Sequence, residues 1–346
     1  MKIALLKREA QRAGGVEKHV RRIIDAFVER HHQVTLVTPP KLHSFTRTGK
    51  LKEFDAYCAE FIQTNPQDVV LGMDRCRHQT HIRAGSGVHA AYLDYRRQEE
   101  GLWRGLSFTL SPFHREILDI EKCSLQDSSL KKVIVNSAMV GDEFVSYYNF
   151  DRKKIAVLHN GVQFSEMASD FAAWPEKRGK TSRFEFLFVG HNFERKGLHH
   201  LLEALSHLNR DDYHLTVVGS DKKQSYFASL AQKKGLPVTF VGHTNPLPYY
   251  QQADALVIPS LYDPFANVTV EALAMGLFVI TSPRNGGKEV LTEETGIISE
   301  NKDLSSALSL AMKRPKTWER SVAIRSTVQH LDFSHQLAKL CDLCTS

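Results

Sequence analysis

The stretch FEFLFVGHNFERKGLHHLLEAL, residues 184–205, contains a strand, a loop and a helix in that order. Its first part is an almost unbroken apolar run, which is typical of a parallel strand buried on both faces. Its last part repeats apolar residues at helical spacing. Between the two lies a loop from Gly190 to Gly197 that contains Arg195 and Lys196. A buried strand joined to a helix by a short loop is the repeating unit of a parallel α/β sheet.

The same alternation continues in both directions along the chain. Apolar, strand-like runs occur before this stretch at 2–7, 33–39, 68–73, 131–137 and 154–162, and after it at 213–220, 238–243, 254–260 and 278–284. Stretches with helical spacing separate many of these runs, and this order predicts parallel sheets covered by helices on both faces. The predicted fold class is therefore α/β, with two Rossmann-like, doubly wound parallel-sheet domains.

A polar segment interrupts the alternation and divides the chain. It contains Pro175, Lys177, Arg178 and Lys180, and we interpret residues 166–182 as a linker. This predicts an N-terminal domain at 1–165 and a C-terminal domain at 183–314. Residues 315–346 have the pattern of amphipathic helices with little strand character.

The composition is that of an ordinary soluble protein and limits the partners. Hydrophobic residues make up 42% of the 346 positions and charged residues 24%. No apolar run reaches the ~20 residues of a membrane span, and Lys7 ends the first apolar stretch too early for a signal peptide. We therefore expect a cytosolic protein. The net charge of +6 suits polyanions such as nucleotides, acidic lipid headgroups or nucleic acid.

The cysteines give little support for a metal or redox site. The five residues are scattered, and they are Cys58, Cys76, Cys123, Cys341 and Cys344. The last two form a CxxC without the second pair that a zinc ribbon needs. We interpret all five as reduced thiols.

Two loops follow predicted strands of the C-terminal domain and carry charged side chains. In the first, Arg195 and Lys196 suit a diphosphate, because one offers a planar fork and the other a point charge. In the second, Asp263 and Glu271 lie eight positions apart around the start of a helix whose amides can receive a phosphate. Glu271, about one turn into that helix, could accept both ribose hydroxyls. The alternatives are a solvated charge pair and an acid that serves the helix dipole.

Two glycine-rich turns lie in the N-terminal domain. Gly14 and Gly15 precede a helix and either approach a phosphate or form a plain turn. The second turn, RAGSGVH at 83–89, matches a dinucleotide fingerprint in spacing alone, because it does not follow the first strand of a βαβ unit. His89 directly follows this turn near the mouth of the predicted sheet, so we expect it to contact a ligand.

Together these motifs resemble glycosyltransferase family 4. The family's E-x7-E motif is similar to Asp263-x7-Glu271 followed by EALAMG, VGHNFERKGL resembles its donor diphosphate loop, and GGVEKHV resembles its N-terminal glycine-rich loop. Within the family, RAGSGVHAAYL looks closest to the lipopolysaccharide core glucosyltransferase I group. The chain departs from these patterns at Asp263, one methylene shorter than glutamate, and at Ser86, where related sequences often have an acid.

The resemblance implies the GT-B fold, in which two Rossmann-like domains face each other across a cleft and residues 315–346 pack back on the first. It implies a metal-independent, retaining hexosyltransferase without a cofactor, moving glucose from UDP-glucose onto a lipopolysaccharide inner-core heptose or a similar glycan. Another family 4 sugar (N-acetylhexosamine, mannose or heptose) with another acceptor is the first alternative, and a GT-B epimerase or phosphorylase the second. A nicotinamide oxidoreductase and a nucleic-acid binder lack their motifs.

The implied site residues fall into three groups. His89 would orient the sugar, Asp263 would hold its hydroxyls, and Arg195 and Lys196 would neutralise the departing diphosphate. The aromatic and arginine-rich stretch 92–120 suits either an anionic membrane surface or a helix pair that lines the acceptor site, so peripheral contact with the inner membrane is one reading. The protein is expected to be a monomer. The expected donor-binding residues are Gly14, Gly15, Gly190, Arg195, Lys196, Pro264, Phe265, Ala266, Asn267, Val268 and Glu271, and those on the acceptor side are Arg83 and Ser86.

Overall fold

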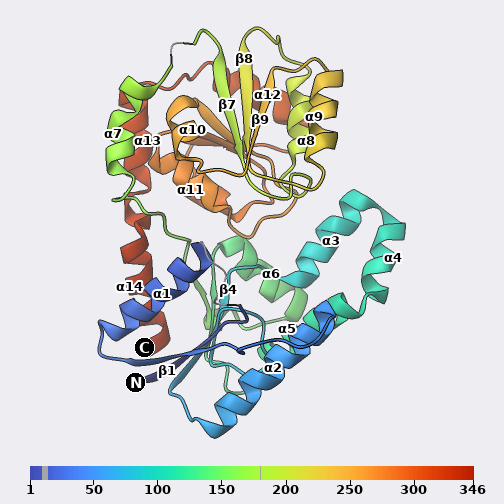
Figure 1. The fold of residues 1–346 in the computed structure, drawn as a ribbon, viewed down its shortest axis with the longest axis vertical. Helices are drawn as coiled ribbons and strands as arrows, with labels where there is room; N and C mark the ends of the chain where they lie inside the picture. Colours follow the sequence, from blue (N-terminus) through green and yellow to red (C-terminus); the bar gives the residue numbers. More distant parts are fainter. Residues whose placement is uncertain (10–14, 180) are drawn as a thin grey trace. The chain divides into compact units, whose positions relative to one another are not determined.

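A computed structural model describes residues 1–9, 15–179 and 181–346, which form two compact units. Unit 1 contains residues 1–159 and 336–346, and unit 2 contains residues 160–335. Each unit is built on its own six-stranded parallel sheet with helices packed on it (Figure 1). The prediction of two doubly wound α/β units is confirmed.

Unit 1 has the strand order β2-β1-β3-β4-β5-β6, and every neighbouring pair is parallel. Strands β1 and β3 are buried along nearly their whole length, as expected for a sheet covered on both faces. The elements are β1 (Lys2–Leu6), α1 (Gly15–Val28), β2 (Gln33–Val37), α2 (Arg47–Thr64), β3 (Val69–Gly72), β4 (His81–Ala84), α3 (His89–Glu100), α4 (Leu102–Leu110), α5 (Pro112–Gln126), β5 (Lys132–Val135), α6 (Ala138–Tyr148), η1 (Arg152–Lys154) and β6 (Ile155–Val157).

Unit 2 has the order β12-β11-β10-β7-β8-β9, again parallel throughout. In Figure 1, α8, α9 and α12 flank one side of its sheet, and α10, α11 and α13 the other. Its elements are α7 (Ala168–Lys177), β7 (Phe184–Val189), α8 (Leu198–Leu205), β8 (Tyr213–Val218), α9 (Gln224–Lys233), β9 (Val238–Gly242), α10 (Leu247–Gln252), β10 (Ala255–Ile258), α11 (Asn267–Ala274), β11 (Phe278–Thr281), η2 (Gly286–Val290), β12 (Gly296–Ile298), η3 (Asn301–Asp303), α12 (Leu304–Met312), α13 (Trp318–Thr327) and η4 (Gln329–Leu331).

The strand order of unit 2 reverses between β7 and β10. From β7 the chain proceeds to β8 and β9 on one side, and from β10 to β11 and β12 on the other. In open α/β sheets the crevice at such a reversal, outside the carboxyl ends of the strands, is where ligands bind. The loops after β7 and β10 contain the two charged motifs of the sequence.

The segment 166–182 differs from our prediction of a linker. It contains α7, whose Phe171 and Trp174 are buried in the core of unit 2, and the Phe171 ring stacks on Trp318 at 5.2 Å between centroids. The chain passes between the units earlier, at 159–160. The sequence did not reveal this helix, because its short apolar face is followed directly by the charged residues 176–178.

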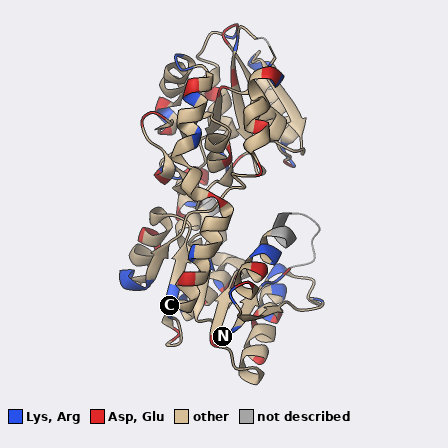
Figure 2. Ribbon diagram, turned by 90° about the vertical axis from the view of Figure 1, so that its left-hand side faces the viewer, with Lys and Arg blue, Asp and Glu red and all other residues tan. Residues whose placement is uncertain are grey.

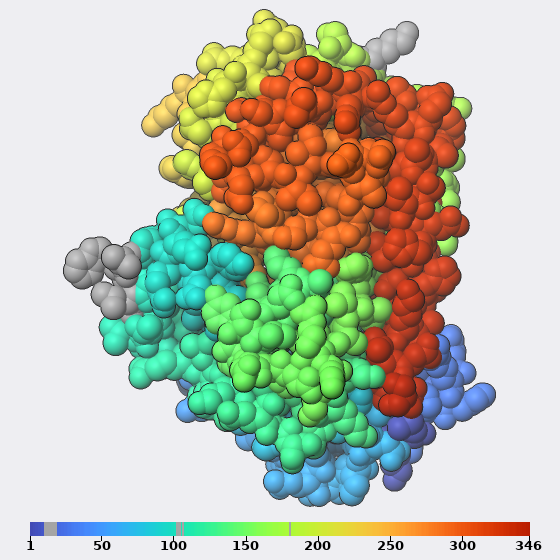
Figure 3. Space-filling model, turned by 180° about the vertical axis from the view of Figure 1, so that it is seen from behind, coloured from blue at the N-terminus to red at the C-terminus, as the bar shows by residue number. Residues whose placement is uncertain are grey.

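The end of the chain also divides differently from the single packing segment that we expected. Helix α13 belongs to unit 2, where the Ser321 hydroxyl donates to the Gly276 carbonyl at 3.1 Å and Ile324 is buried. Helix α14 (Phe333–Thr345) brings Leu340, Cys341 and Cys344 into the core of unit 1. Figure 3 shows this last part of the chain, in red, at the surface.

Basic and acidic residues are interspersed over the face drawn in Figure 2. Among the described helices, none is long and apolar enough to cross a bilayer.

Candidate functional site

The carboxylate of Asp263 holds the two charged loops of unit 2 together. Its Oδ2 atom lies 2.5 Å from Lys196 Nζ and 3.1 Å from Arg195 Nη1. Arg195 Nη1 also donates to the Tyr262 carbonyl at 3.0 Å, so its guanidinium is held at the β10 side of the crevice. Lys196 is 9% exposed and Asp263 6%. The structure thus brings together three of the residues expected at this site.

The loop after β7 needs glycine where it meets β10. Gly197 has φ +80°, and a Cβ atom there would lie 1.9 Å from the Pro259 carbonyl oxygen. Gly190 begins the loop, and its amide donates to the Val218 carbonyl at 2.9 Å. The loop can therefore lie directly on the end of the neighbouring strand, which brings Arg195 and Lys196 to the Asp263 carboxylate.

Helix α11 begins at Asn267, as predicted. Asn267 is exposed and Val268 is half-buried, whereas Phe265 and Ala266 are buried and Pro264 is half-buried. The helix N-terminus thus presents polar backbone close to the surface, a favourable position for a phosphate oxygen.

Asn285 positions this turn, and the sequence analysis missed it. The side chain is fully buried, and its Oδ1 accepts hydrogen bonds from the amides of Ala266 at 3.1 Å and Gly287 at 3.0 Å. Its Nδ2 donates to Thr281 Oγ1 at 2.8 Å. The sequence signal was available, because an Asn-Gly-Gly turn directly follows the strand-like run at 278–284.

Glu271 lies one turn into α11, and a buried tyrosine contacts it. The Tyr250 hydroxyl donates to Glu271 Oε2 at 2.8 Å. Burial raises the pKa of the Glu271 carboxyl, while the Tyr250 hydrogen bond and the charge of Lys196 act in the opposite direction. Burial likewise raises the pKa of Tyr250 well above its usual value, so the hydroxyl stays a proton donor. Tyr250 is a second residue that the sequence analysis missed.

His89 is the first residue of α3 in unit 1 and lies in a separate polar network. Its Nε2 lies 3.0 Å from Nδ1 of His114, and its amide donates to both carboxylate oxygens of Glu121, at 2.9 and 3.1 Å. Burial, followed by the charge of Arg75, lowers the pKa of His89 to about 3, so the ring is neutral at pH 7. His114 and Glu121 were not predicted from the sequence.

Glu121 has two further donors, Arg75 Nε at 3.0 Å and the Tyr148 hydroxyl at 2.8 Å. This buried carboxylate on α5 connects the start of α3 to two other segments of unit 1.

The remaining glycine-turn residues have different surroundings. Ser86 is exposed within the turn, whereas Arg83 on β4 donates from Nη1 to the Leu158 carbonyl at 3.1 Å. Burial lowers the pKa of Arg83 to about 10. Gly15 opens α1, and Gly14 lies outside the described residues.

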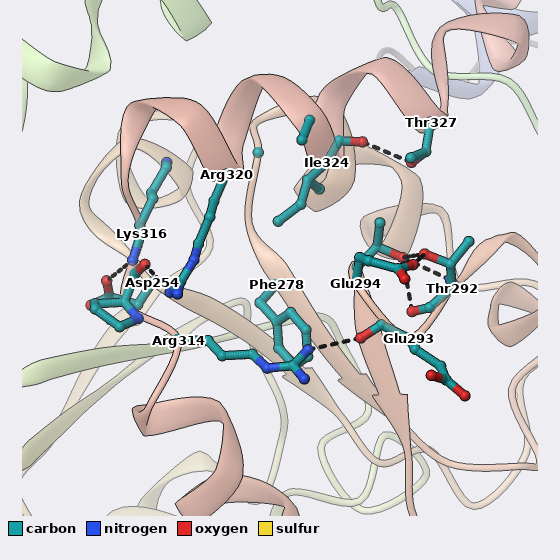
Figure 4. A pocket seen from close by; sticks show the side chains of 14 residues that line it. Asp254, Phe278, Thr292, Glu293, Glu294, Arg314, Lys316, Arg320, Ile324 and Thr327 are labelled. Atoms are coloured by element: carbon teal, nitrogen blue, oxygen red, sulfur yellow. Dashed lines mark hydrogen bonds between the residues drawn. The ribbon is translucent and has the colours of Figure 1, made fainter.

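A cavity of about 640 Å³ lies elsewhere in unit 2 (Figure 4). Its lining includes Asp254, Phe278 and Thr295, which precede or begin β10, β11 and β12, together with Lys316 and Arg320. It is therefore at the amino ends of the strands, opposite the charged loops. Within the described ranges, no three His, Cys, Asp or Glu side chains are grouped so that they could hold a metal ion.

Comparisons with known proteins give the same assignment for both halves of the chain. Residues 170–323 match the family model "Glycosyl transferases group 1", and residues 13–166 match "Glycosyltransferase Family 4". The chain is 31% identical to glycogen synthase of Mycobacterium tuberculosis over 219 residues, which cover 60% of this chain and 51% of that protein. It thus spans about half the length of that relative.

The chain is also similar to lipopolysaccharide glucosyltransferase WaaG of Escherichia coli K12, with 25% identity over 296 residues that cover 78% of this chain and 77% of WaaG. The crystal structure of WaaG superimposes with a TM-score of 0.78 at 22% identity, covering both chains fully. Anabaena HepE in complex with UDP-glucose gives a TM-score of 0.64 at 18% identity, covering 99% of this chain and 98% of HepE.

Proposed function

This chain belongs to the group 1 and family 4 glycosyltransferases, and we infer that it transfers a hexose from a nucleoside diphosphate sugar to a glycan acceptor. The observation that carries the proposal is the group of charges at the carboxyl ends of β7 and β10, where Arg195 and Lys196 contact Asp263 and the charge of Lys196 acts on Glu271 in α11. Two cations suit a diphosphate, and a helix-borne carboxylate suits a ribose.

UDP-glucose is the proposed donor, and a lipopolysaccharide inner-core heptose the proposed acceptor. WaaG is named as a lipopolysaccharide glucosyltransferase, and the HepE structure holds UDP-glucose. Both relatives support glucose, and the WaaG relationship supports the acceptor. Another family 4 sugar or acceptor remains the competing assignment.

The proposed reaction retains configuration at the anomeric carbon. The bond between C1 of the sugar and the diphosphate oxygen breaks while the acceptor hydroxyl oxygen bonds to C1 from the same face, and the hydroxyl proton passes to the departing diphosphate. Arg195 and Lys196 stabilise the negative charge that develops on the diphosphate, which is the role a metal ion has in other transferases. His89, neutral at pH 7, can orient the sugar by hydrogen bonding without adding charge.

Peripheral contact with an anionic membrane is part of the proposal. In the segment 92–120, the Arg96 guanidinium lies 4.4 Å from the centroid of the Phe108 ring, and Leu110 is 72% exposed. Leu110 is thus available to the headgroup region of acidic lipids, whereas Phe108 is 5% exposed and contacts Arg96 from within the fold.

The test is a thermal-shift panel of UDP-, ADP- and GDP-sugars, followed by transfer assays. A donor that binds only the folded protein raises the melting temperature, so UDP-glucose should give the largest shift. Transfer to a heptose-containing core oligosaccharide, and not to glycogen, is the expected second result. A shift with another donor alone, or conversion of a UDP-sugar without any acceptor, contradicts the proposal.

A further inference from the structure

Both carboxylate oxygens of Asp263 already have partners within the protein. Oδ2 contacts Lys196 at 2.5 Å and Arg195 at 3.1 Å, and Oδ1 accepts the Phe265 amide at 3.3 Å. Only 9% of the side chain is exposed. A carboxylate in this position neutralises the two cations and has little surface left to contact a sugar. The motif, by contrast, implies that Asp263 binds the sugar hydroxyls.

The backbone around Asp263 keeps the carboxylate in this place. Its amide donates to the Arg284 carbonyl at 3.0 Å, and its carbonyl accepts the Gly286 amide at 2.9 Å. The chain at 263 therefore pairs with the loop after β11 on both sides of the residue. Because the aspartate side chain has only one methylene, it cannot move far from the two cations without breaking this pairing.

We propose that Asp263 is a positioning residue that acts as an internal counter-ion, competing with the bound diphosphate for Arg195 and Lys196 and so promoting its release. The inference rests on the proposed function and concerns the same site. Together the three side chains carry a net charge of +1, which holds a diphosphate less tightly than two unopposed cations would.

The counter-ion role and the sugar-ligand role predict different substrate dependence. A counter-ion acts on any ligand with a diphosphate, with or without a sugar. A sugar ligand leaves UDP unaffected and changes only the binding of UDP-sugars. Uridine, which has no phosphate, should be insensitive in both cases.

The experiment is calorimetric titration of wild type and Asp263→Asn with UDP, uridine and inorganic pyrophosphate, together with stopped-flow release of UDP. Asparagine keeps the shape and removes the charge. We expect UDP and pyrophosphate to bind about tenfold more tightly and UDP to leave correspondingly more slowly, because close charge pairs of this kind are strongly coupled. Uridine binding should not change.

Glu194→Gln is the matched control. Glu194 lies in the same loop, but its carboxylate pairs with Lys223 at 2.6 Å, and both side chains are exposed. The variant removes the same charge from the protein without freeing either crevice cation, so UDP affinity should stay within about twofold of wild type, as expected for an exposed pair.

A double variant tests the same idea if Asp263→Asn alone folds poorly, because replacing Lys196 as well leaves no unpaired buried lysine. Lys196→Met alone leaves Arg195 neutralised by Asp263, so UDP affinity should fall. Adding Asp263→Asn restores a net charge of +1, and UDP affinity should return to within about threefold of wild type. If Asp263 binds sugar, the second substitution restores nothing.

Failure of this inference can be distinguished from failure of the proposed function. Equal or weaker UDP and pyrophosphate binding by Asp263→Asn, with altered selectivity only among UDP-sugars, overturns the counter-ion role and leaves the transferase proposal standing. Tighter pyrophosphate binding by the variant, in a protein that binds no nucleotide, supports the counter-ion and rejects the donor.

Discussion

The Glu271 carboxyl group is where ribose binding can be tested most directly. Its position on α11 was evident from the sequence, but Tyr250 was not, because a tyrosine on a six-residue helix gives no sign of which way its hydroxyl points. The same holds for Asn285. Sequence spacing identified the charged residues of the crevice, whereas their buried hydrogen-bond partners come from elements whose approach is determined by tertiary packing.

We predict that Glu271→Gln lowers UDP affinity about tenfold or more, because hydrogen bonds to charged groups contribute ~1.5–3 kcal/mol. The melting temperature at pH 7 should not fall. The pKa of Glu271 is raised in the folded protein, so its ionisation opposes folding above the pKa of the unfolded chain. Calorimetric titration with UDP and thermal unfolding of wild type and variant provide the two measurements. Equal UDP affinities with a lowered melting temperature would show that Glu271 only stabilises the helix and does not bind ribose.

Tyr250→Phe should move the acid limit of UDP binding to higher pH. The tyrosine hydrogen bond lowers the pKa of the Glu271 carboxyl against the effect of burial. Without it, protonation begins at a higher pH, and the protonated acid cannot accept both ribose hydroxyls. UDP affinity measured from pH 8 down to about pH 4, a range that includes the ordinary glutamate pKa of ~4.3 and a rise above it, tests this.

The double variant Tyr250→Phe/Glu271→Gln is the control for that experiment, because it shows only the titration of UDP itself. Coincident profiles for wild type and Tyr250→Phe would contradict the assigned contact.

Helix α3 starts without a side-chain cap from its own sequence. Val88 occupies the N-cap position, and Glu121 of α5 accepts the His89 amide in place of a cap. A distant carboxylate that caps a helix leaves no local motif, which is why capping rules did not reveal it. The start of the helix, and with it the place of His89, depends on α5.

Glu121→Gln should lower the free energy of unfolding by ~1–3 kcal/mol, since it weakens hydrogen bonds from Arg75, Tyr148 and the start of α3. Asp119→Asn is the control on the same helix, because Asp119 is 58% exposed and should contribute less than ~1 kcal/mol. Denaturant unfolding measures both changes. Faster hydrogen exchange at the His89 amide in Glu121→Gln alone would locate the effect, and equal changes in the two variants would remove the capping role.

Strand prediction succeeded where a strand is apolar and failed where it is short or contains polar residues. Strand β4, HIRA, looked like part of a loop, yet His81 is 2% exposed. Burial lowers the pKa of His81 to about 4, so the neutral ring packs in the sheet much as an apolar side chain would.

Strand β12 has three residues, too few for a periodic pattern. Helix α7 was missed because Phe171 and Trp174 find their partner, Trp318, far along the chain.

At the scale of the whole molecule, the fold was predictable because the alternation of strands and helices extends through nearly the whole sequence. The division into units was less predictable, since it depends on contacts between residues distant in sequence. The pairing of Val162 with the segment around Asp332 ties both ends of unit 2 together. Such pairings leave no trace in local composition.

We predict that transferase activity survives excess EDTA. The cations Arg195 and Lys196 supply positive charge at the crevice, and a protein guanidinium or ammonium is not removed by a chelator. Initial rates with and without EDTA, after dialysis against the chelator, provide the measurement. Loss of activity that Mg²⁺ or Mn²⁺ restores would show that the two side chains are not sufficient.

The return of α14 to unit 1 has a consequence for synthesis on the ribosome. Leu340, Cys341 and Cys344 pack against Ile3, Leu5 and other residues near the start of the chain. At roughly 5–20 residues per second, the stretch from 159 to 336 takes about 9–35 s to translate. During that interval the apolar face of the first strands that α14 covers remains exposed. Unit 2 is contiguous in sequence and can fold before α14 is complete. The nascent first unit is therefore a natural client for a chaperone that binds at the exit tunnel.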